Sequence, residues 1–175
     1  MVALASSAMK AALAGGAVGL AFMRIRASKG YNPEQFGFVR PPALSTLGFV
    51  ATYLAWMLAS DAVIHWRGPW DFGPWRQAPL LASTLRVLAV CILGPTAEEL
   101  IFRSLFFNWL SKRLPMLIVV GTTAVSWAFL HYTYSWSVIA IIVVDGILLG
   151  LARWKTGSVV PPILMHAAYN FYAIW

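Results

Sequence analysis

The sequence is poor in charged residues, and in acidic residues above all. Only 11% of its 175 residues are charged, and 6 are Asp or Glu, whereas roughly 25% of the residues in an ordinary soluble domain are charged. Too few charged side chains remain to cover a globule that is 60% hydrophobic and contains 9 Trp and 10 Phe. The same numbers exclude disorder, because a disordered segment combines low hydrophobicity with high charge. The composition therefore indicates an integral membrane protein.

Cysteine is almost absent, and positive charge is not concentrated on one surface. The single cysteine, Cys91, lies in an apolar run, which excludes a disulfide framework within the chain. The formal net charge is +7, but the 13 Lys and Arg fall in short groups between apolar stretches. Basic loops between membrane spans follow from the positive-inside rule, so we expect no nucleic-acid partner.

The long apolar stretches predict an all-α, polytopic transmembrane helical bundle that forms a single membrane domain over residues 1–175. At 1.5 Å rise per residue, about 20 apolar residues cross the bilayer core, which gives about six spans here. Gly94-Pro95 interrupts the third stretch, for which we expect either a kinked helix or two shorter helices. The six stretches are Val2 to Met23, Ala43 to Ser60, Leu80 to Leu110, Leu114 to Leu130, Trp136 to Ala152 and Ser158 to Trp175.

The basic residues predict how this bundle is oriented. An N-terminus outside the cell would place most of them on the cytoplasmic side of the membrane. Only Arg67 and Arg76 would then lie in outer loops. Two helices in place of the third span would reverse the orientation of everything after it. The residues expected on the cytoplasmic side are Arg24, Arg26, Lys29, Arg40, Lys112, Arg113, Arg153 and Lys155.

Ionisable residues inside apolar spans are costly in lipid and are therefore functional candidates. Glu98 and Glu99 are adjacent within the third stretch. Glu99 and Arg103 are four residues apart with the acid first, so they can pair on one helical face, and we interpret them as a structural ion pair. Glu98 points about 100° away around the helix and has no local partner. Desolvation can tune such a carboxylate for acid–base chemistry near neutral pH.

Histidines in two later stretches add further polar groups. His166 and Asn170 are four residues apart and share a helical face. An imidazole N–H and a carboxamide NH2 can donate to a developing oxyanion, although alone such a pair is more often an interhelical clamp. His131 follows Trp127 at the same spacing, at the end of the fourth stretch. Three separate apolar stretches thus contribute polar groups, which indicates one shared site.

In their order and spacing these motifs resemble those of the CPBP family, the CAAX-protease and bacteriocin-processing group of intramembrane endopeptidases, also called the Abi family. The family pattern is Glu-Glu-x-x-x-Arg, Phe-x-x-x-His and His-x-x-x-Asn/Asp on successive transmembrane helices. The resemblance covers residues 94–175 and leaves the helices of residues 1–93 without an assigned role. Trp127 stands where Phe is usual, a conservative change that bears on pocket shape more than on chemistry. The matching residues are Glu98, Glu99, Arg103, Trp127, His131, His166 and Asn170.

The resemblance implies a CAAX-type (type II CPBP) endopeptidase that acts on a membrane-associated or lipid-anchored protein or peptide. An activated water would hydrolyse the peptide bond without a covalent acyl-enzyme. By this analogy Glu98 and His131 position and deprotonate the water, and His166 and Asn170 stabilise the oxyanion. No cofactor is expected.

The same analogy assigns supporting roles to three further residues. Arg103 would hold Glu99 in place, and Trp127 would line the substrate pocket. We expect a multi-pass protein of a prokaryotic cell membrane, whose partners are its substrate and the lipid bilayer.

Two other functions fit the same residues. A zinc-dependent membrane endopeptidase would use Glu98, His131 and His166 as ligands around an activated water. The helical His-Glu-x-x-His zinc motif does not occur in the sequence, however. A non-enzymatic membrane scaffold, immunity protein or small-solute carrier would use the buried polar groups only to lock helices together.

Overall fold

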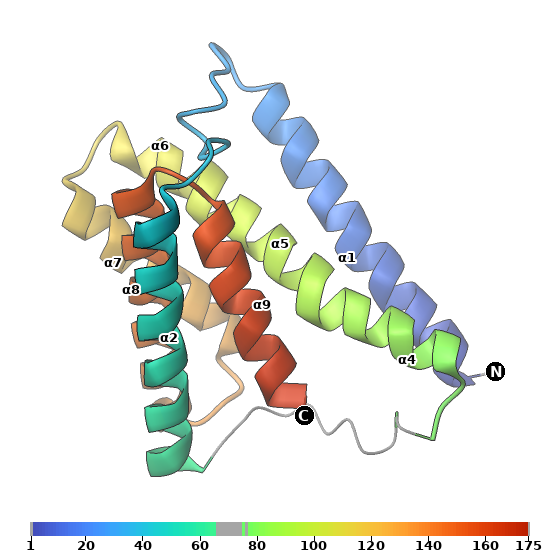
Figure 1. Ribbon diagram of the computed structural model, residues 1–175. Coiled ribbons are helices and arrows are strands. Elements are labelled where there is room, and N and C mark those ends of the chain that lie inside the picture. The colour runs from blue at the N-terminus through green and yellow to red at the C-terminus, as the bar shows by residue number, and fades with distance from the viewer. Residues whose placement is uncertain (1, 66–74, 76, 175) are drawn as a thin grey trace.

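The computed structural model describes residues 2–65, 75 and 77–174 of the chain. These residues form helices and no strand, and Figure 1 shows the helices running side by side as a bundle. This architecture confirms the all-α prediction. The helical segments are α1 (Val2–Arg26), α2 (Ala43–Ile64), a long helix from Leu80 to Ser111, α7 (Met116–Ala128), α8 (Trp136–Thr156) and α9 (Val160–Ile174).

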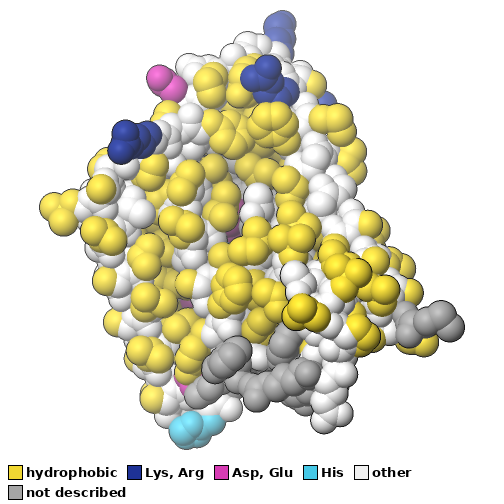
Figure 2. Space-filling view, turned by 45° about the vertical axis from the view of Figure 1, so that its right-hand side comes forward, with side chains coloured by type: hydrophobic (Ala, Val, Ile, Leu, Met, Phe, Trp, Pro, Cys, Tyr) yellow, Lys and Arg dark blue, Asp and Glu magenta, His cyan; other side chains and the backbone are white. Residues whose placement is uncertain are grey.

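Each predicted apolar stretch corresponds to one of these helical segments. By length and composition, α1, α2, the long helix and α8 can each cross a membrane. A turn of 3-10 helix, η3 (Phe129–His131), extends α7 into a shorter apolar helix, and α9 is also short. Hydrophobic side chains cover most of the face shown in Figure 2. The protein is therefore an integral membrane protein.

The third apolar stretch forms one helix that continues through Gly94-Pro95. Proline lacks the N–H that an interior helical position supplies. The helix continues past it because the turn before Gly94-Pro95 is a wider π turn. Leu80 to Ser111 therefore forms one span and not two, so the predicted orientation of the later helices is not reversed. The successive parts of the helix are α4 (Leu80–Val87), the π-helical η1 (Leu88–Leu93), α5 (Gly94–Glu99), the π-helical η2 (Leu100–Phe106) and α6 (Phe107–Ser111).

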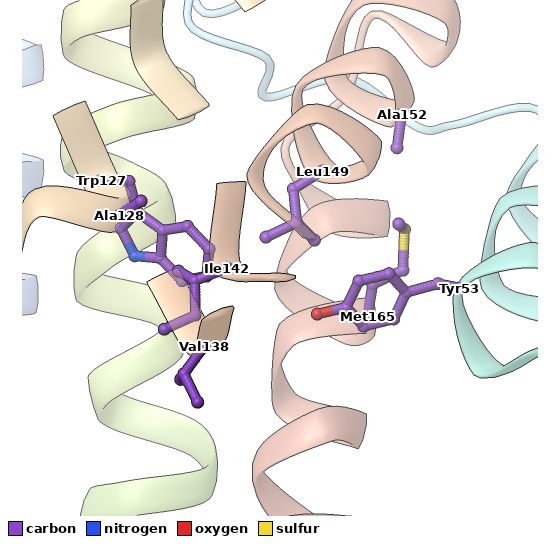
Figure 3. Packing of buried hydrophobic residues seen from close by; sticks show 8 residues of the cluster. All are labelled: Tyr53, Trp127, Ala128, Val138, Ile142, Leu149, Ala152 and Met165. Atoms are coloured by element: carbon purple, nitrogen blue, oxygen red, sulfur yellow. The ribbon is translucent and has the colours of Figure 1, made fainter. Parts of the chain in front are cut away.

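The main hydrophobic core lies where α2, α7, α8 and α9 meet. In Figure 3 the Trp127 indole of α7 lies next to Ile142 of α8, and Tyr53 of α2 lies next to Met165 of α9. The helices α7 and α8 approach closely because Gly146 has no side chain. A Cβ at Gly146 would lie 2.9 Å from the Cα of Ala124. The complete cluster is Tyr53, Trp127, Ala128, Val138, Ile142, Leu149, Ala152 and Met165.

The connector between α1 and α2 is fastened to the rest of the bundle. Buried Arg153 donates from Nε to the Arg103 carbonyl and from Nη2 to the Gln35 carbonyl, both at 2.9 Å. Gly37 has φ of 84°, and a Cβ there would lie 2.7 Å from Arg153 Nε, so this position requires glycine. The connector therefore fixes the C-terminal end of α1 against the helices that carry the candidate site.

Basic residues gather at one end of the bundle. The C-terminal ends of α1, α6 and α8 lie at this end (Figure 1), and Figure 2 shows Lys and Arg side chains there above the hydrophobic surface. The positive-inside rule predicts that this end faces the cytoplasm, and this orientation stays a prediction. Arg67 and Arg76, which were expected on the opposite side, lie outside the described residues.

Candidate active site

Glu99 is the centre of a buried ionic network. Its Oε1 accepts a hydrogen bond from Arg103 Nη1 at 3.1 Å and lies 2.9 Å from His166 Nδ1. The side chains of Glu99 and Arg103 are both 0% exposed. Arg103 Nη2 also donates to the Gly146 carbonyl at 3.2 Å. The ion pair predicted from the four-residue spacing is therefore present, and it also binds a histidine from α9.

This network fixes the orientation of the His166 ring. An ionised carboxylate only accepts hydrogen bonds, so Nδ1 of His166 carries the hydrogen that faces Glu99. The opposite ring nitrogen, Nε2, lies 4.0 Å from Oε2 of Glu98. His166 is buried and thus lies between the two glutamates, with Nε2 directed toward Glu98.

Glu98 differs from its neighbour in both exposure and partner. Its side chain is 34% exposed. Its Oε2 accepts a hydrogen bond of 2.6 Å from the indole Nε1 of Trp127 on α7. The sequence showed no partner for Glu98 on its own helix, and the structure supplies one from another helix. A phenylalanine at position 127 has no N–H to donate, so this departure from the family pattern affects the carboxylate as well as the pocket shape.

Trp127 also separates two histidines. Its ring makes edge-on contacts with His131, at 5.5 Å between centroids, and with His166, at 5.1 Å. His131 is the last residue of η3 and lies within electrostatic range of Glu98 and His166. The three apolar stretches thus bring Glu98, Glu99, Arg103, Trp127, His131 and His166 together in one cluster.

Asn170 makes a contact that the sequence did not predict. Its Nδ2 donates to the Val90 carbonyl in η1 at 2.8 Å. The Gly94 N–H bonds to the Ala89 carbonyl five residues back, so the same π spacing would pair Val90 with Pro95, which has no N–H. Asn170 satisfies the carbonyl that the proline leaves free. One amide hydrogen of this side chain is therefore already committed.

A cavity of about 280 Å³ opens beside Glu98 and Asn170. Its other walls come from η1, from the Gly94-Pro95 turn and from α1, including Lys10 and Leu13. The N-terminal helix, to which no motif gave a role, therefore covers the exposed side of the candidate carboxylate. This wall could not be predicted, because the α1 sequence has no chemical motif.

A metal site needs three or more ligating side chains at one place. Among the described residues, no group of three or more His, Cys, Asp and Glu side chains could hold a metal ion. His166 is bound to Glu99 through one ring nitrogen, as metal-ligating histidines often are to a carboxylate, and its other ring nitrogen is 4.0 Å from Glu98. The described residues nevertheless include no assembled set of three zinc ligands, and the zinc-dependent alternative stays a hypothesis.

A comparison with protein-family models identifies the family to which the segment around this cluster belongs. Residues 80–172 match the family model described as type II CAAX prenyl endopeptidase Rce1-like. The chain belongs to this family. The match covers more than half of the chain and includes all seven residues of the three motifs. No curated protein and no solved structure matches the chain.

Membership of the Rce1-like family confirms the resemblance that the motifs suggested. The family is one of membrane proteases, which act on membrane-associated peptides. The matched segment begins at the long helix and ends in α9, so α1 and α2 lie outside it. The wall that α1 contributes is therefore a feature of this chain beyond the family match.

Removal of Arg103 should leave Glu99 as an uncompensated buried charge. We expect Arg103→Met to lower the stability by about 3–5 kcal/mol, and the double variant Glu99→Gln/Arg103→Met to recover part of this loss. Thermal unfolding in detergent, followed by circular dichroism, measures both. Arg40→Met, which removes an exposed cation, should unfold like the wild type. An Arg103→Met protein as stable as the wild type would show that Glu99 does not depend on this pair.

Proposed function

We propose that the protein is a CAAX-type intramembrane endopeptidase that hydrolyses a peptide bond in a membrane-associated or lipid-anchored substrate. The observation that carries this proposal is the position of Glu98. Its carboxylate is partly exposed beside a cavity, is oriented by Trp127 and lies 4.0 Å from His166 Nε2, whereas adjacent Glu99 is sealed in an ion pair. The two neighbouring acids thus have separate tasks, one reactive and one structural.

Glu98 acts in the proposed mechanism as the general base. It takes a proton from a water molecule whose oxygen attacks the scissile carbonyl carbon, and it later returns this proton to the leaving amine. His131, whose ring contacts the Trp127 ring edge-on, helps to position the water. Because the water attacks directly, no covalent acyl-enzyme forms.

His166 and the remaining amide hydrogen of Asn170 stabilise the oxyanion. His166 donates from Nε2 when its ring is protonated, since Nδ1 faces Glu99. A protonated ring is compatible with this environment, because it balances the charges of Glu98, Glu99 and Arg103. The Val90 carbonyl holds the Asn170 side chain in a fixed orientation, so that this donor needs no reorganisation during the reaction.

The catalytic core is assigned to residues 94–175, and the N-terminal helices complete the walls of the site. The proposal includes no cofactor. A location in a prokaryotic cell membrane stays a prediction.

Replacement of Glu98 by glutamine should abolish proteolysis without unfolding the protein. Glutamine has nearly the same shape but cannot accept the proton, so we expect a loss of roughly 10²–10⁴-fold in rate. New protein termini in membranes from cells that express either the wild type or Glu98→Gln measure this loss. Glu34→Gln, in the exposed connector, is the matched control. Equal cleavage by Glu98→Gln and the wild type would refute the proposed base, and unchanged termini in cells lacking the gene would refute proteolysis.

Replacement of Trp127 by phenylalanine tests whether the indole N–H matters in addition to the ring. The variant keeps an aromatic ring but loses the hydrogen bond to a charged carboxylate, which is typically worth about 1.5–3 kcal/mol. We expect cleavage to fall by roughly ten-fold or more, as 1.4 kcal/mol corresponds to ten-fold in rate. Trp136→Phe, at the exposed start of α8, should leave the rate unchanged. Full activity of Trp127→Phe would mean that this hydrogen bond does not orient Glu98 for catalysis.

Metal removal separates the proposed mechanism from zinc catalysis. We expect cleavage by the purified protein to survive exhaustive chelation and dialysis, because the residues that the structure describes include no group of three metal ligands. Elemental analysis of the same sample should find less than one metal ion per chain. Loss of activity that is restored by added zinc would favour the zinc-dependent alternative.

A further inference from the structure

A second pocket lies at the basic end of the bundle, away from Glu98. It has a volume of about 690 Å³ and lies between the C-terminal end of α1 and the last turns of the long helix. Neither the motifs nor the family match assigns any task to it. Its walls combine two chemistries, positive charge and hydrocarbon, which together define what can occupy it.

Four cationic side chains line this pocket. Arg24 and Lys29 come from the end of α1 and the residues after it, and Lys112 and Arg113 directly follow the end of α6. Within the described part of the chain, none of the four forms a salt bridge. Their mutual repulsion favours the binding of an anion between the two helices.

One of these cations is held in position by the helix that precedes it. Arg113 donates from Nη1 to the Trp109 carbonyl at 2.8 Å, and its guanidinium lies 4.7 Å from the centre of the Trp109 ring. The other guanidinium nitrogens have no hydrogen bond in the described part of the structure. Buried Asn108 adds an uncharged amide to the wall. The pocket therefore offers several N–H donors at one place, the arrangement that binds phosphate oxygens.

The rest of the wall is apolar and belongs to a membrane span. Ile101, Leu105 and Phe106 line the pocket along the long helix, and Ile101 is 40% exposed. Ile101 lies ten residues before Ser111, the last residue of this helix, which is about 15 Å at 1.5 Å per residue. The wall thus extends from the bilayer core to the cationic end, and Trp109, 53% exposed, lies between them. Tryptophan at this depth is typical of the membrane–water interface.

We propose that this pocket binds one anionic phospholipid from the surrounding leaflet. The lipid phosphate lies among Arg24, Lys29, Lys112 and Arg113, and part of an acyl chain covers Ile101 and Leu105. A free phosphate ion would leave the apolar wall uncovered, and an uncharged lipid would leave the cations unpaired. Basic pockets between transmembrane helices on the cytoplasmic side bind anionic headgroups in this way. The inference does not depend on the proposed proteolysis.

The bound lipid also joins α1 to the family-matched helices. The phosphate bridges cations of α1 and α6, so its binding holds the two helices together at the cytoplasmic end. The same helix α1 forms a wall of the cavity beside Glu98. Stabilisation of the bundle by anionic lipid is therefore the expected physical effect.

Binding can be measured on the full-length protein in detergent. We use dioleoyl phosphatidylglycerol and dioleoyl phosphatidylcholine as probes, and native mass spectrometry and thermal unfolding as readouts. One phosphatidylglycerol should be retained per chain and should raise the unfolding temperature, whereas phosphatidylcholine should do neither. Inorganic phosphate and glycerol phosphate, at the same concentration, should have no effect.

Paired charge variants locate the site. Arg24→Gln/Lys112→Gln removes two cations of the pocket, and Arg40→Gln/Lys155→Gln removes two cations at the same end outside it. We expect the first pair to weaken phosphatidylglycerol binding by about ten-fold or more and the second pair to weaken it much less. Equal weakening by both pairs would overturn the proposal in favour of diffuse attraction to the basic end. Binding of inorganic phosphate as strong as that of the lipid would overturn it in favour of a simple anion site.

A second measurement keeps the test decisive if the pocket variant does not fold. Wild-type protein is reconstituted with phosphatidylglycerol that carries a photoreactive acyl chain, irradiated, and digested for peptide mapping. Labelling concentrated within residues 101–113 would support the proposal. Labelling spread over the other lipid-facing helices would overturn it.

Discussion

The buried charge of Glu99 constrains the whole site. A carboxylate that is fully removed from water is tolerated only with charged or hydrogen-bonding partners, and Oε1 of Glu99 has Arg103 on its own helix and His166 from α9. Arg103 in turn reaches the Gly146 carbonyl on α8. Three helical segments are thereby fixed relative to one another. Since Glu98 is the next residue, its direction is set at the same time, and it points to the cavity and to Trp127.

The proline in the long helix extends this constraint. A proline inside a helix removes one backbone hydrogen bond. With the π spacing of η1, the carbonyl that loses its backbone donor is that of Val90. Asn170 offsets the loss, which means that the defect in one helix positions a polar side chain of another. π turns are frequent at functional sites because they expose backbone groups in this way. The irregular helix and the Asn170 side chain therefore depend on each other.

The sequence predicts local features well and contacts between helices poorly. The apolar stretches, the Glu99–Arg103 pair and the disturbance at Gly94-Pro95 each depend on spacing within one segment, and the structure contains all of them. The hydrogen bond from Trp127 to Glu98 depends on how α7 is rotated against the long helix, which no local pattern encodes. The π turns also change which residues share a face, so a 3.6-residue period cannot predict what Asn170 contacts.

No motif in the sequence assigns a role to the N-terminal helix α1. Its packing gives it one, as a wall of the cavity beside Glu98. Glu98 is useful as a base only if water and substrate reach it in a bounded space, and α1 supplies a wall of that space. The position of α1 is not set by the ionic network, which lies entirely in the family-matched segment. It is set instead by the connector, which Arg153 ties to η2, and by packing against the long helix. Access to the carboxylate is therefore determined by how α1 packs along the long helix and by the connector that Arg153 holds, and not by the ionic network alone.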